Sequence, residues 1–531
     1  MNRRELGLLA ACVAVFLALS LRRAGDHAYP YWDDVGFLEL GNQVREMGGP
    51  LPLFEALFAG TWTEDNRNPL YPALLSLVAG RDPGYHTRAI ALNLGLGVLA
   101  LVAWWWFNRR HFGPRTALIV AAFFALSETT IEHASKETSE PLLLIFWALA
   151  LERIFRGPRA WWAAGVFAGL AQLTKGSGIF LVAILAVTLL LERGWKAVRD
   201  WRAWTMPAGF VVAALPLLWR NAVVFGTPLH HWNNRLLWNN RMPDYAETYA
   251  PHALERIPHG FSQWIRHTTF LDVVWGRLLM GIAEVSVHIG DAISLMTPRN
   301  LGPWHIPGVI VGFALFVVAL RLLWKEPPSF KRTFLLVQAA FFVVFFVWFS
   351  VLGGASRYMI PMTLPLLAVL ATHADARWLK RYAFFAAACV AIALVFDPYP
   401  RRLPDGFGEA QDWLAAHVRP GEAYVVDSRS HLEPLWRMPR ETRMEIVSSA
   451  WQRQPIPAGE LLEEFRRRGV RYVVIDGSSH KDAQLRYFFF DTIHRNPDGG
   501  IEPQGLPAGL RPVYVGAEQP RTWLVLELVN G

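Results

Sequence analysis

Long apolar runs alternate with short polar loops along the chain up to residue 396. The runs cover residues 6–21, 87–107, 116–131, 141–155, 160–173, 177–191, 203–219, 306–324, 333–352, 358–372 and 382–396. Several are shorter than the roughly 20 residues that a perpendicular membrane helix needs, so their polar ends must lie at the interface or face a protein-lined cavity. The pattern predicts an α-helical polytopic membrane protein with about eleven transmembrane helices.

Positive charges fall mostly on one side of these predicted crossings. With the N-terminus inside, nineteen Lys and Arg residues lie in the inner segments, whereas the short outer loops hold only Lys136, Lys175 and Arg357. Because Lys and Arg are retained on the cytoplasmic side, we expect a protein of the plasma (inner) membrane with a cytoplasmic N-terminus. An odd number of crossings then places three segments outside: the loops 22–86 and 221–305, and the chain after residue 396.

The chain after residue 396 is polar and has the pattern of a small α/β domain. We expect helices at 408–417 and 460–468, and strands at 424–427, 472–476, 513–515 and 523–528. This region holds no glycine-rich loop of the dinucleotide or P-loop type, so no nucleotide cofactor is expected. The sequence therefore predicts a membrane domain, 1–396, followed by a soluble extracytoplasmic α/β domain, 397–531.

The composition agrees with a membrane protein and excludes one alternative. Hydrophobic residues make up 53% of the chain and charged residues 18%, and the net charge is +8. The positive residues lie between apolar runs, where membrane topology explains them, so a nucleic-acid partner is excluded. Cys12 and Cys389 both lie inside apolar runs, which excludes a disulfide framework and a cysteine zinc site.

The first long outer loop opens on two adjacent carboxylates, Asp33 and Asp34. The apolar residues after them fall on one face of a helix, which we expect to lie on the membrane surface: Phe37, Leu38, Leu40, Val44 and Met47. Adjacent carboxylates can hold a divalent cation or supply a general base. Alternatively, Asp33 is a helix N-cap and Asp34 is a first-turn residue that the helix dipole favours.

Two further groups of polar residues are site candidates on the outer side. The first group, in a Pro-rich segment that otherwise suggests a turn capping a short surface helix, is Glu64, Arg67, Asn68 and Tyr71. The second group, at helical spacings, is Glu128, Glu132, His133, Lys136 and Glu140. So many ionisable groups beside a bilayer are energetically unfavourable, which suggests that they have a function. Alternatively, Glu132 and Lys136 form an i,i+4 pair on a solvated face, and Glu128 and His133 are candidate metal ligands.

Lys175 and Arg357 each interrupt apolar runs on the predicted outer side, against the charge rule. Cations placed beside membrane helices suit a lipid phosphate, which Arg can bind in a forked geometry. For either residue alone, snorkelling to lipid headgroups is the alternative explanation.

Six segments, in this order, resemble the polytopic C-type glycosyltransferases that use polyprenyl-phosphate-linked sugars, namely the bacterial protein O-mannosyltransferases and the lipid A aminoarabinose transferase. They are Asp33-Asp34 and residues 68–72, 139–144, 169–176, 216–228 and 357–365. The resemblance implies the C-type glycosyltransferase fold, with Asp33 as catalytic base and Asp34 assisting it or helping to hold a metal. It also implies that Lys175 and Arg357 lie near the donor phosphate, and that Glu140 matches an acidic position of the second outer loop.

The chain departs from the family at Arg67 and Asn68, which stand where the family has His and Pro. Any metal ligand or acceptor contact that this His makes in the family is therefore in doubt here. A divalent metal ion held by Asp34 and Glu140 is one prediction, but two cationic side chains can stabilise a phosphate without it.

The chemistry implied is transfer of a sugar from a polyprenyl-phosphate carrier to an acceptor hydroxyl of a lipid, glycan or protein. A carboxylate activates the hydroxyl, cations stabilise the leaving phosphate, and a single direct displacement inverts the anomeric configuration. Two alternatives are a ligase that moves a whole polysaccharide and a lipid or glycan transporter. A transporter predicts repeat symmetry and ions near the bilayer midplane, whereas the ionisable residues here gather at one face.

Overall fold

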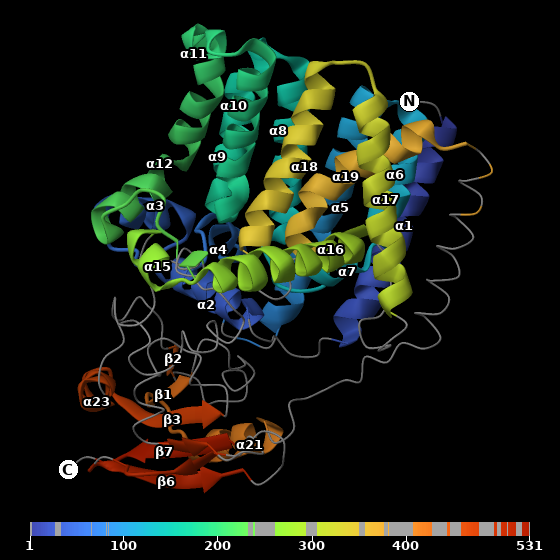
Figure 1. Cartoon of the computed structure of the whole chain (residues 1–531). Helices are drawn as coiled ribbons and strands as arrows, with labels where there is room; N and C mark the ends of the chain where they lie inside the picture. The colour runs from blue at the N-terminus through green and yellow to red at the C-terminus, as the bar shows by residue number, and fades with distance from the viewer. Residues whose placement is uncertain are drawn as a thin grey trace.

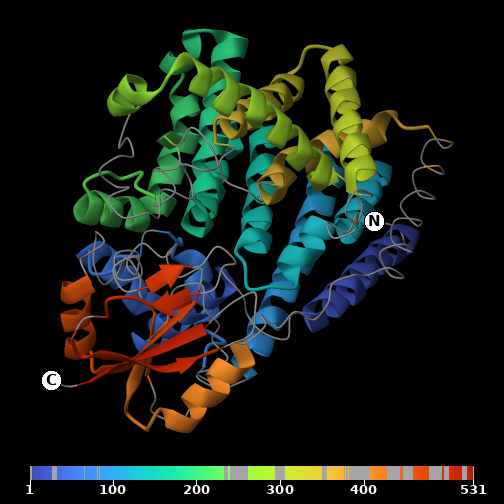
Figure 2. The same ribbon diagram turned by 60° about the horizontal axis from the view of Figure 1, so that its bottom comes forward.

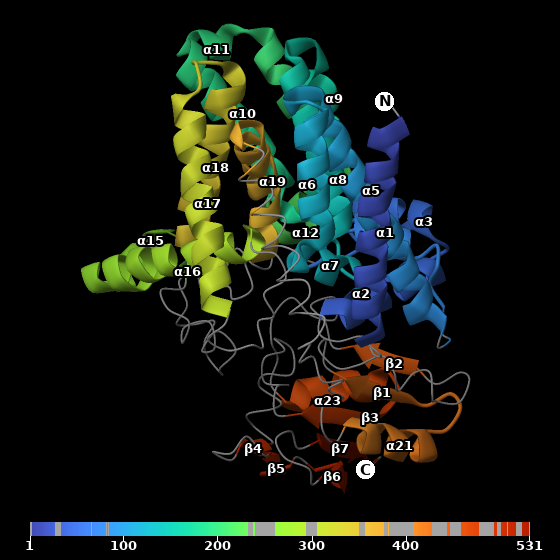
Figure 3. The ribbon, with the colours of Figure 1, turned by 90° about the vertical axis from the view of Figure 1, so that its right-hand side faces the viewer.

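The computed structural model describes residues 3–26, 33–64, 66–80, 82, 84–231, 237–238, 261–293, 305–349, 356–375, 377, 381, 407–426, 443–446, 458–476, 493–495, 501–506, 508–516 and 523–529. The residues before 376 form a bundle of helices, and a small domain made by the residues from 407 onward lies at one end of it (Figure 1). The N-terminus lies at the opposite end of the bundle (Figure 3).

Helices form at each of the first ten predicted apolar runs. They are α1 (Arg3–Asp26), α5 (Gly84–Phe112), α6 (Pro114–Leu126), α8 (Glu140–Arg156), α9 (Trp161–Thr174), α10 (Ile179–Arg193), α12 (Thr205–Phe225), α17 (His305–Lys325), α18 (Phe330–Trp348) and α19 (Ser356–His373). The eleventh run, 382–396, lies outside the described residues. Within the described part, seven segments are long and apolar enough to cross a membrane, or eight if the bent pair α6 and α7 (Glu128–Ala134) is one span. The chain is therefore a helical, multi-pass membrane protein.

The predicted loop 221–305 holds helical structure that the apolar pattern did not indicate: α15 (Phe261–His267), the π-helix η5 (Asp272–Leu279) and α16 (Met280–Ile293). Together, η5 and α16 form one of the seven candidate spans, yet α16 lies across the lower ends of α17 and α18 in Figure 1. It crosses α17 closely, because a Cβ at Gly290 or Gly312 would lie within 2.4 Å of backbone of the other helix. Charged residues interrupt its apolar run, which is why the sequence pattern predicted a loop.

Ion pairs join the ends of several helices at the end of the bundle that holds the N-terminus. Arg109 at the end of α5 pairs with Glu5 of α1 at 2.7 Å, and Arg110 pairs with Glu152 of α8 at 3.2 Å. These contacts require the start of α1 and the ends of α5 and α8 to lie together. The bundle thus groups these charged termini as the predicted inner loops require.

The first predicted outer loop forms three helices at the opposite end: α2 (Asp33–Glu46), α3 (Pro50–Ala59) and α4 (Leu70–Leu75). The expected helix after the acidic pair is present. Most of its apolar face does not rest on a membrane surface, however, because it packs inside the protein; Met47, just after the helix, is 39% exposed. Phe37 and Leu38 share a buried cluster with Tyr71 and Leu75, and Leu40 and Val44 share another with residues of α3 and α4.

The small domain is a mixed α/β unit, as predicted. Its elements are α21 (Phe407–His417), β1 (Ala423–Val426), β2 (Arg443–Ile446), α23 (Ala458–Arg467), β3 (Val470–Asp476), β4 (Ile493–Arg495), β5 (Ile501–Pro503), β6 (Leu510–Val515) and β7 (Trp523–Leu528). The main sheet has the order β2-β1-β3-β7-β6, with β1 parallel to β2 and β3, and β7 antiparallel to β3 and β6. The sequence pattern missed β2, β4 and β5.

The small domain docks on the helices of the first loop (Figure 2). Leu414, Tyr424 and Trp523 belong to the same buried apolar cluster as Tyr71 and Leu75. Burial of apolar side chains from both parts stabilises this contact. The domain therefore lies at the end of the bundle that carries the acidic pair.

Candidate functional site

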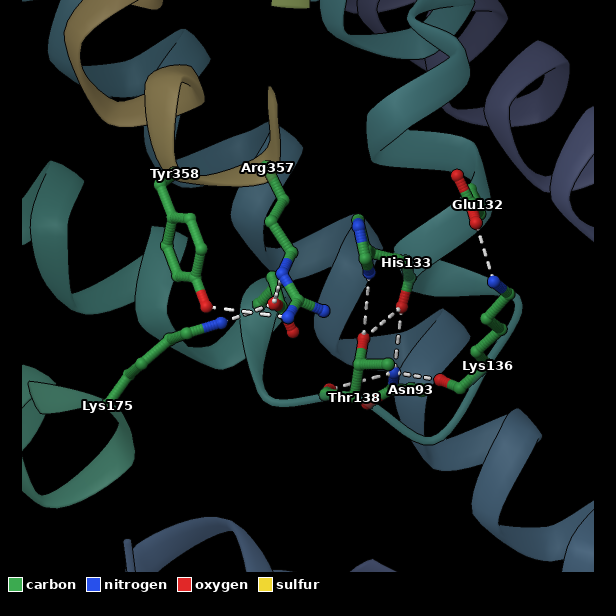
Figure 4. Close-up of polar contacts among 9 residues, drawn as sticks. Asn93, Glu132, His133, Lys136, Thr138, Lys175, Arg357 and Tyr358 are labelled. Carbon is green, nitrogen blue, oxygen red and sulfur yellow. Dashed lines mark hydrogen bonds and ion pairs between the residues drawn. The ribbon is translucent and has the colours of Figure 1, made fainter. Parts of the chain in front are cut away.

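Lys175 and Arg357 come from distant parts of the chain and lie close together beside Tyr358 (Figure 4). Both contact Glu140. Lys175 follows α9, Arg357 is in the first turn of α19, and Glu140 begins α8. Nζ of Lys175 forms an ion pair with Oε1 of Glu140, and Nε of Arg357 lies 3.3 Å from the same oxygen. The Glu140 side chain is 4% exposed, while those of Lys175 and Arg357 are 18% and 26% exposed. These three side chains therefore carry two positive charges against one buried negative charge.

Tyr358 lies against both cations. Nζ of Lys175 is 4.4 Å from the centre of its ring and Cζ of Arg357 is 5.1 Å away, which are cation–π distances. Nη2 of Arg357 also donates a 3.4 Å hydrogen bond to the Tyr358 hydroxyl. Sequence reasoning missed Tyr358, although it directly follows Arg357 in the segment that resembles the family.

Asn93 of α5 holds the loop that leads to Glu140. Its Nδ2 donates to the carbonyl oxygens of His133 at 3.0 Å, Thr138 at 3.1 Å and Lys136. Its Oδ1 accepts a 3.0 Å hydrogen bond from the hydroxyl of Tyr71. Both side chains are fully buried. The predicted candidate Tyr71 therefore supports this loop through Asn93, a residue that the sequence pattern did not single out.

A second buried contact that sequence reasoning missed fixes the same loop. Nδ1 of His86, in the first turn of α5, contacts Oε1 of Glu137. Both residues are buried. Glu137 lies between the candidates Lys136 and Glu140 but was not itself singled out, and His86 shows no pattern that would pair it with Glu137.

Lys175, Arg357 and Glu140 form a group that we call the cation cluster. The other ionisable candidates of this loop do not join it. Lys136 pairs with Glu132 at 2.5 Å, as the i,i+4 alternative predicted, and the two point toward each other and away from Lys175 in Figure 4. His133 is buried, and its Nδ1 lies 3.4 Å from Oγ1 of Thr138. Glu128 begins α7 and is half-buried.

The acidic pair lies at the start of α2. Asp33 is the first residue of the helix, and its side chain lies outside the described part of the structure; Asp34 is 5% exposed. The Arg67 guanidinium lies against this helical turn, because a Cβ at Gly36 would be 2.3 Å from Cζ of Arg67. The same Cζ is 5.4 Å from the centre of the Phe37 ring. A cation therefore lies beside the first turn that carries both carboxylates.

The segment 64–68 connects this turn with the helix end that carries Lys175. Oε1 of Glu64 accepts from the backbone N–H groups of Asn66 at 2.9 Å and Arg67 at 3.0 Å, so Glu64 stabilises a turn. Nδ2 of Asn68 donates a 2.5 Å hydrogen bond to the carbonyl oxygen of Gln172, three residues before Lys175. The predicted candidates Glu64, Arg67 and Asn68 thus belong to one segment that contacts both α2 and the end of α9.

The described residues do not offer a divalent-cation site. No three His, Cys, Asp or Glu residues among them lie close enough together to hold a metal ion. Oε1 of the predicted ligand Glu140 contacts two cations. The other predicted ligand, Asp34, belongs to the helical turn against which the Arg67 guanidinium lies. A metal ion at either place would be repelled by the cations already there.

Comparison with known proteins gives a family match over part of the chain and a similar fold. Residues 84–219 match the family of dolichyl-phosphate-mannose-protein mannosyltransferases. No curated protein sequence matches the chain. The chain is similar to the archaeal oligosaccharyltransferase AglB from Archaeoglobus fulgidus in complex with an inhibitory peptide and a dolichol-phosphate, with 12% identity, a TM-score of 0.51, and coverage of 95% of this chain and 75% of AglB.

Two further solved structures are similar to the chain. The A. fulgidus oligosaccharyltransferase in complex with Zn and sulfate has 13% identity and a TM-score of 0.49, and the match covers 94% of this chain and 74% of that one. ArnT from Cupriavidus metallidurans, bound to undecaprenyl phosphate, has 16% identity and a TM-score of 0.41, with 98% of each chain covered.

The likeness to AglB shows a shared fold. The family match covers α5 to α12 and so includes Glu140 and Lys175, two members of the cation cluster. It confirms the resemblance that the motifs predicted. Over residues 84–219, the chain is similar to the membrane glycosyltransferases of this family.

Proposed function

We propose that the chain transfers one sugar from a polyprenyl-phosphate carrier to an acceptor hydroxyl on the extracytoplasmic side of the plasma membrane. The observation that supports this most is the meeting of Lys175 and Arg357 at buried Glu140. A lone cation at a membrane edge suits snorkelling. Two cations from separate helices on one buried carboxylate are costly to desolvate, and they suit an anionic ligand such as the donor phosphate.

The proposed topology has eleven crossings, a membrane domain of residues 1–396 and an extracytoplasmic domain of residues 397–531. The N-terminus is cytoplasmic, because the predicted inner loops carry nineteen Lys and Arg residues. In this orientation α2, Lys175 and the small domain all face the extracytoplasmic side. Carrier-linked donor and acceptor would meet there.

In the proposed reaction, Asp33 accepts the proton of the acceptor hydroxyl while the hydroxyl oxygen attacks the anomeric carbon of the sugar. The bond between that carbon and the phosphate oxygen breaks, and its electron pair leaves with the polyprenyl phosphate. Lys175 and Arg357 stabilise the negative charge that develops on this phosphate. One direct displacement inverts the anomeric configuration. Asp34 assists Asp33.

Glu140 acts as a positioning residue in this mechanism. It orients both cations through one oxygen and offsets one of their two charges. The remaining positive charge attracts the phosphate without binding it so tightly that the product carrier stays in place. No step uses the divalent ion predicted at Asp34 and Glu140, because the described donor set does not suit one.

The test is transfer from a panel of radiolabelled polyprenyl-phosphate sugars by membranes that contain the chain. We expect Asp33→Asn and Lys175→Met to lower transfer by at least about 100-fold, the usual contribution of a general base or of one charge-stabilising group. Asp82→Asn is the matched control, because Asp82 is an exposed carboxylate of the same loop that pairs with Arg88.

Equal transfer by the wild type and Asp33→Asn would remove Asp33 from the mechanism. A product that carries a whole glycan from a diphosphate carrier would indicate the ligase instead. Absence of product from wild-type membranes with every donor would favour a transporter.

A further inference from the structure

We infer that the Arg67 guanidinium takes the place of a divalent cation beside the carboxylates at the start of α2, so that this transferase works without a metal ion. The inference rests on the proposed function, in which Asp33 is the base. It assigns a positioning role to the residue at which this chain departs from the family motif.

The helix makes room for the guanidinium. A Cβ at Gly36 would lie 2.3 Å from Cζ, 2.4 Å from Nη2 and 2.6 Å from Nη1 of Arg67, so any other residue would displace the guanidinium. Gly36 lies inside α2, and its backbone does not adopt the left-handed conformation that favours glycine. Glycine in a helix interior destabilises the helix relative to alanine. The space that Arg67 fills is therefore the reason that the structure offers for glycine at this position.

Electrostatics ties Arg67 to the acidic pair. The N-terminus of a helix carries partial positive charge, so a cation beside the first turn is unfavourable unless negative groups offset it. Asp34, which lies two residues before Gly36 in the first turn, supplies such a group. Asp34 is 5% exposed, and a carboxylate this buried needs a compensating charge. The cation and the acidic turn thus stabilise each other.

The backbone around Arg67 is fixed on both sides. Glu64 accepts from the backbone N–H of Arg67 at 3.0 Å, and Asn68 donates to the carbonyl oxygen of Gln172 at 2.5 Å. Arg220 of α12 also donates to the backbone oxygens of Trp62, at 3.4 Å, and of Glu64. A charge on a segment held in this way is preorganised, which is the property that makes a metal ion effective at such a place.

The first test measures metal binding on the purified full-length protein and needs no substrate. Electron paramagnetic resonance follows free Mn²⁺ during titration of the wild type, Asp34→Asn and the control Arg88→Gln, which changes an exposed ion pair. We expect no saturable binding of Mn²⁺ by the wild type at micromolar concentrations. Saturable binding that Asp34→Asn abolishes and Arg88→Gln keeps would overturn the inference.

The second test uses the transfer assay of the proposed function. Wild-type transfer should be unchanged by EDTA and by added Mn²⁺. Arg67→Ala should lower transfer by about 100-fold, and millimolar guanidinium chloride should restore part of it, whereas sodium chloride at the same ionic strength should not. Arg67→Lys, which keeps the charge, should retain more transfer than Arg67→Ala.

Loss of wild-type transfer in EDTA, or full transfer by Arg67→Ala, would contradict the inference while leaving the proposed function intact. If the wild type transfers no sugar at all, the proposed function fails, and the Mn²⁺ titration still decides whether a metal binds at the acidic turn. Rescue by guanidinium separates a role of the charge from a folding defect, because a misfolded variant gains nothing from the small cation.

Discussion

Replacing Glu140 by Gln tests how the cation cluster is balanced. In the structure, one buried oxygen of Glu140 contacts both Lys175 and Arg357. The substitution keeps the shape of the side chain but removes the only negative charge among these three groups. The two cations then face each other without the Glu140 charge between them. We expect the protein to become less stable and its affinity for a phosphate to rise.

The size of the effect follows from burial. Removing one partner of a buried ion pair typically costs about 3–5 kcal/mol. Lys175 and Arg357 are 18% and 26% exposed, so water solvates part of their charge, and we expect about 2–3 kcal/mol. Glu132→Gln is the matched control in the same loop. Its pair with Lys136 is an i,i+4 contact with both side chains 21% exposed, which is worth about 0.5 kcal/mol or less.

The assay is thermal unfolding of the detergent-solubilised protein, followed by the fluorescence of its 24 tryptophans. Glu140→Gln should lower Tm by several degrees, and Glu132→Gln should leave it nearly unchanged. Undecaprenyl phosphate should then raise the Tm of Glu140→Gln more than that of the wild type, because its phosphate meets two cations whose charge Glu140 no longer offsets. The reasoning is refuted if Glu140→Gln is as stable as Glu132→Gln, or if the lipid stabilises the variant and the wild type equally.

Two more predictions concern the support of the site and the small domain. Asn93→Leu removes the donor to three loop carbonyls, so it should destabilise the protein by about 2–4 kcal/mol, measured as a fall in Tm, with a parallel loss of transfer; an unchanged Tm would show that other contacts hold the loop. Burial alone would raise the pKa of Glu527, but hydrogen bonds from Arg511 and Arg471 outweigh it and lower the pKa. The carboxylate therefore stabilises the small domain above its ordinary pKa of about 4.3, and this contribution is lost as the pH falls through the lower folded value. Limited proteolysis of the full-length chain between neutral and acidic pH should show this loss. Glu527→Gln should weaken the pH dependence, while Glu464, whose pKa Arg467 and Arg468 also lower, keeps part of it; identical profiles would contradict the assignment.

The sequence predicted the membrane helices because a spanning segment must be apolar along its length. The same rule missed α16, whose run with η5 contains Asp272, Arg277 and Glu284. The short strands β2, β4 and β5 also escaped because each holds few apolar residues, whereas the equally short but apolar β1 was predicted. The sequence predicted the apolar face of α2. It did not predict that this face is buried against α3 and α4, because that contact exists only in the folded chain.

The site was predictable where a residue breaks a rule. Lys175 and Arg357 interrupt apolar runs on the predicted outer side, where Lys and Arg are unusual. In the structure, both belong to the cation cluster. Tyr358 follows a charge but breaks no rule, so its contact with both cations depends on the turn of α19. The contact of His86 with Glu137 joins residues 51 positions apart, which spacing alone does not indicate.

In the proposed mechanism, Lys175 and Arg357 hold the donor phosphate within reach of Asp33. An experimental structure of the full-length protein with undecaprenyl phosphate bound would test this arrangement. We expect phosphate density in contact with Nζ of Lys175 and the guanidinium of Arg357, with the Asp33 carboxylate facing the phosphate. Phosphate bound elsewhere, with both cations still on Glu140 and Asp33 turned away from them, would contradict it.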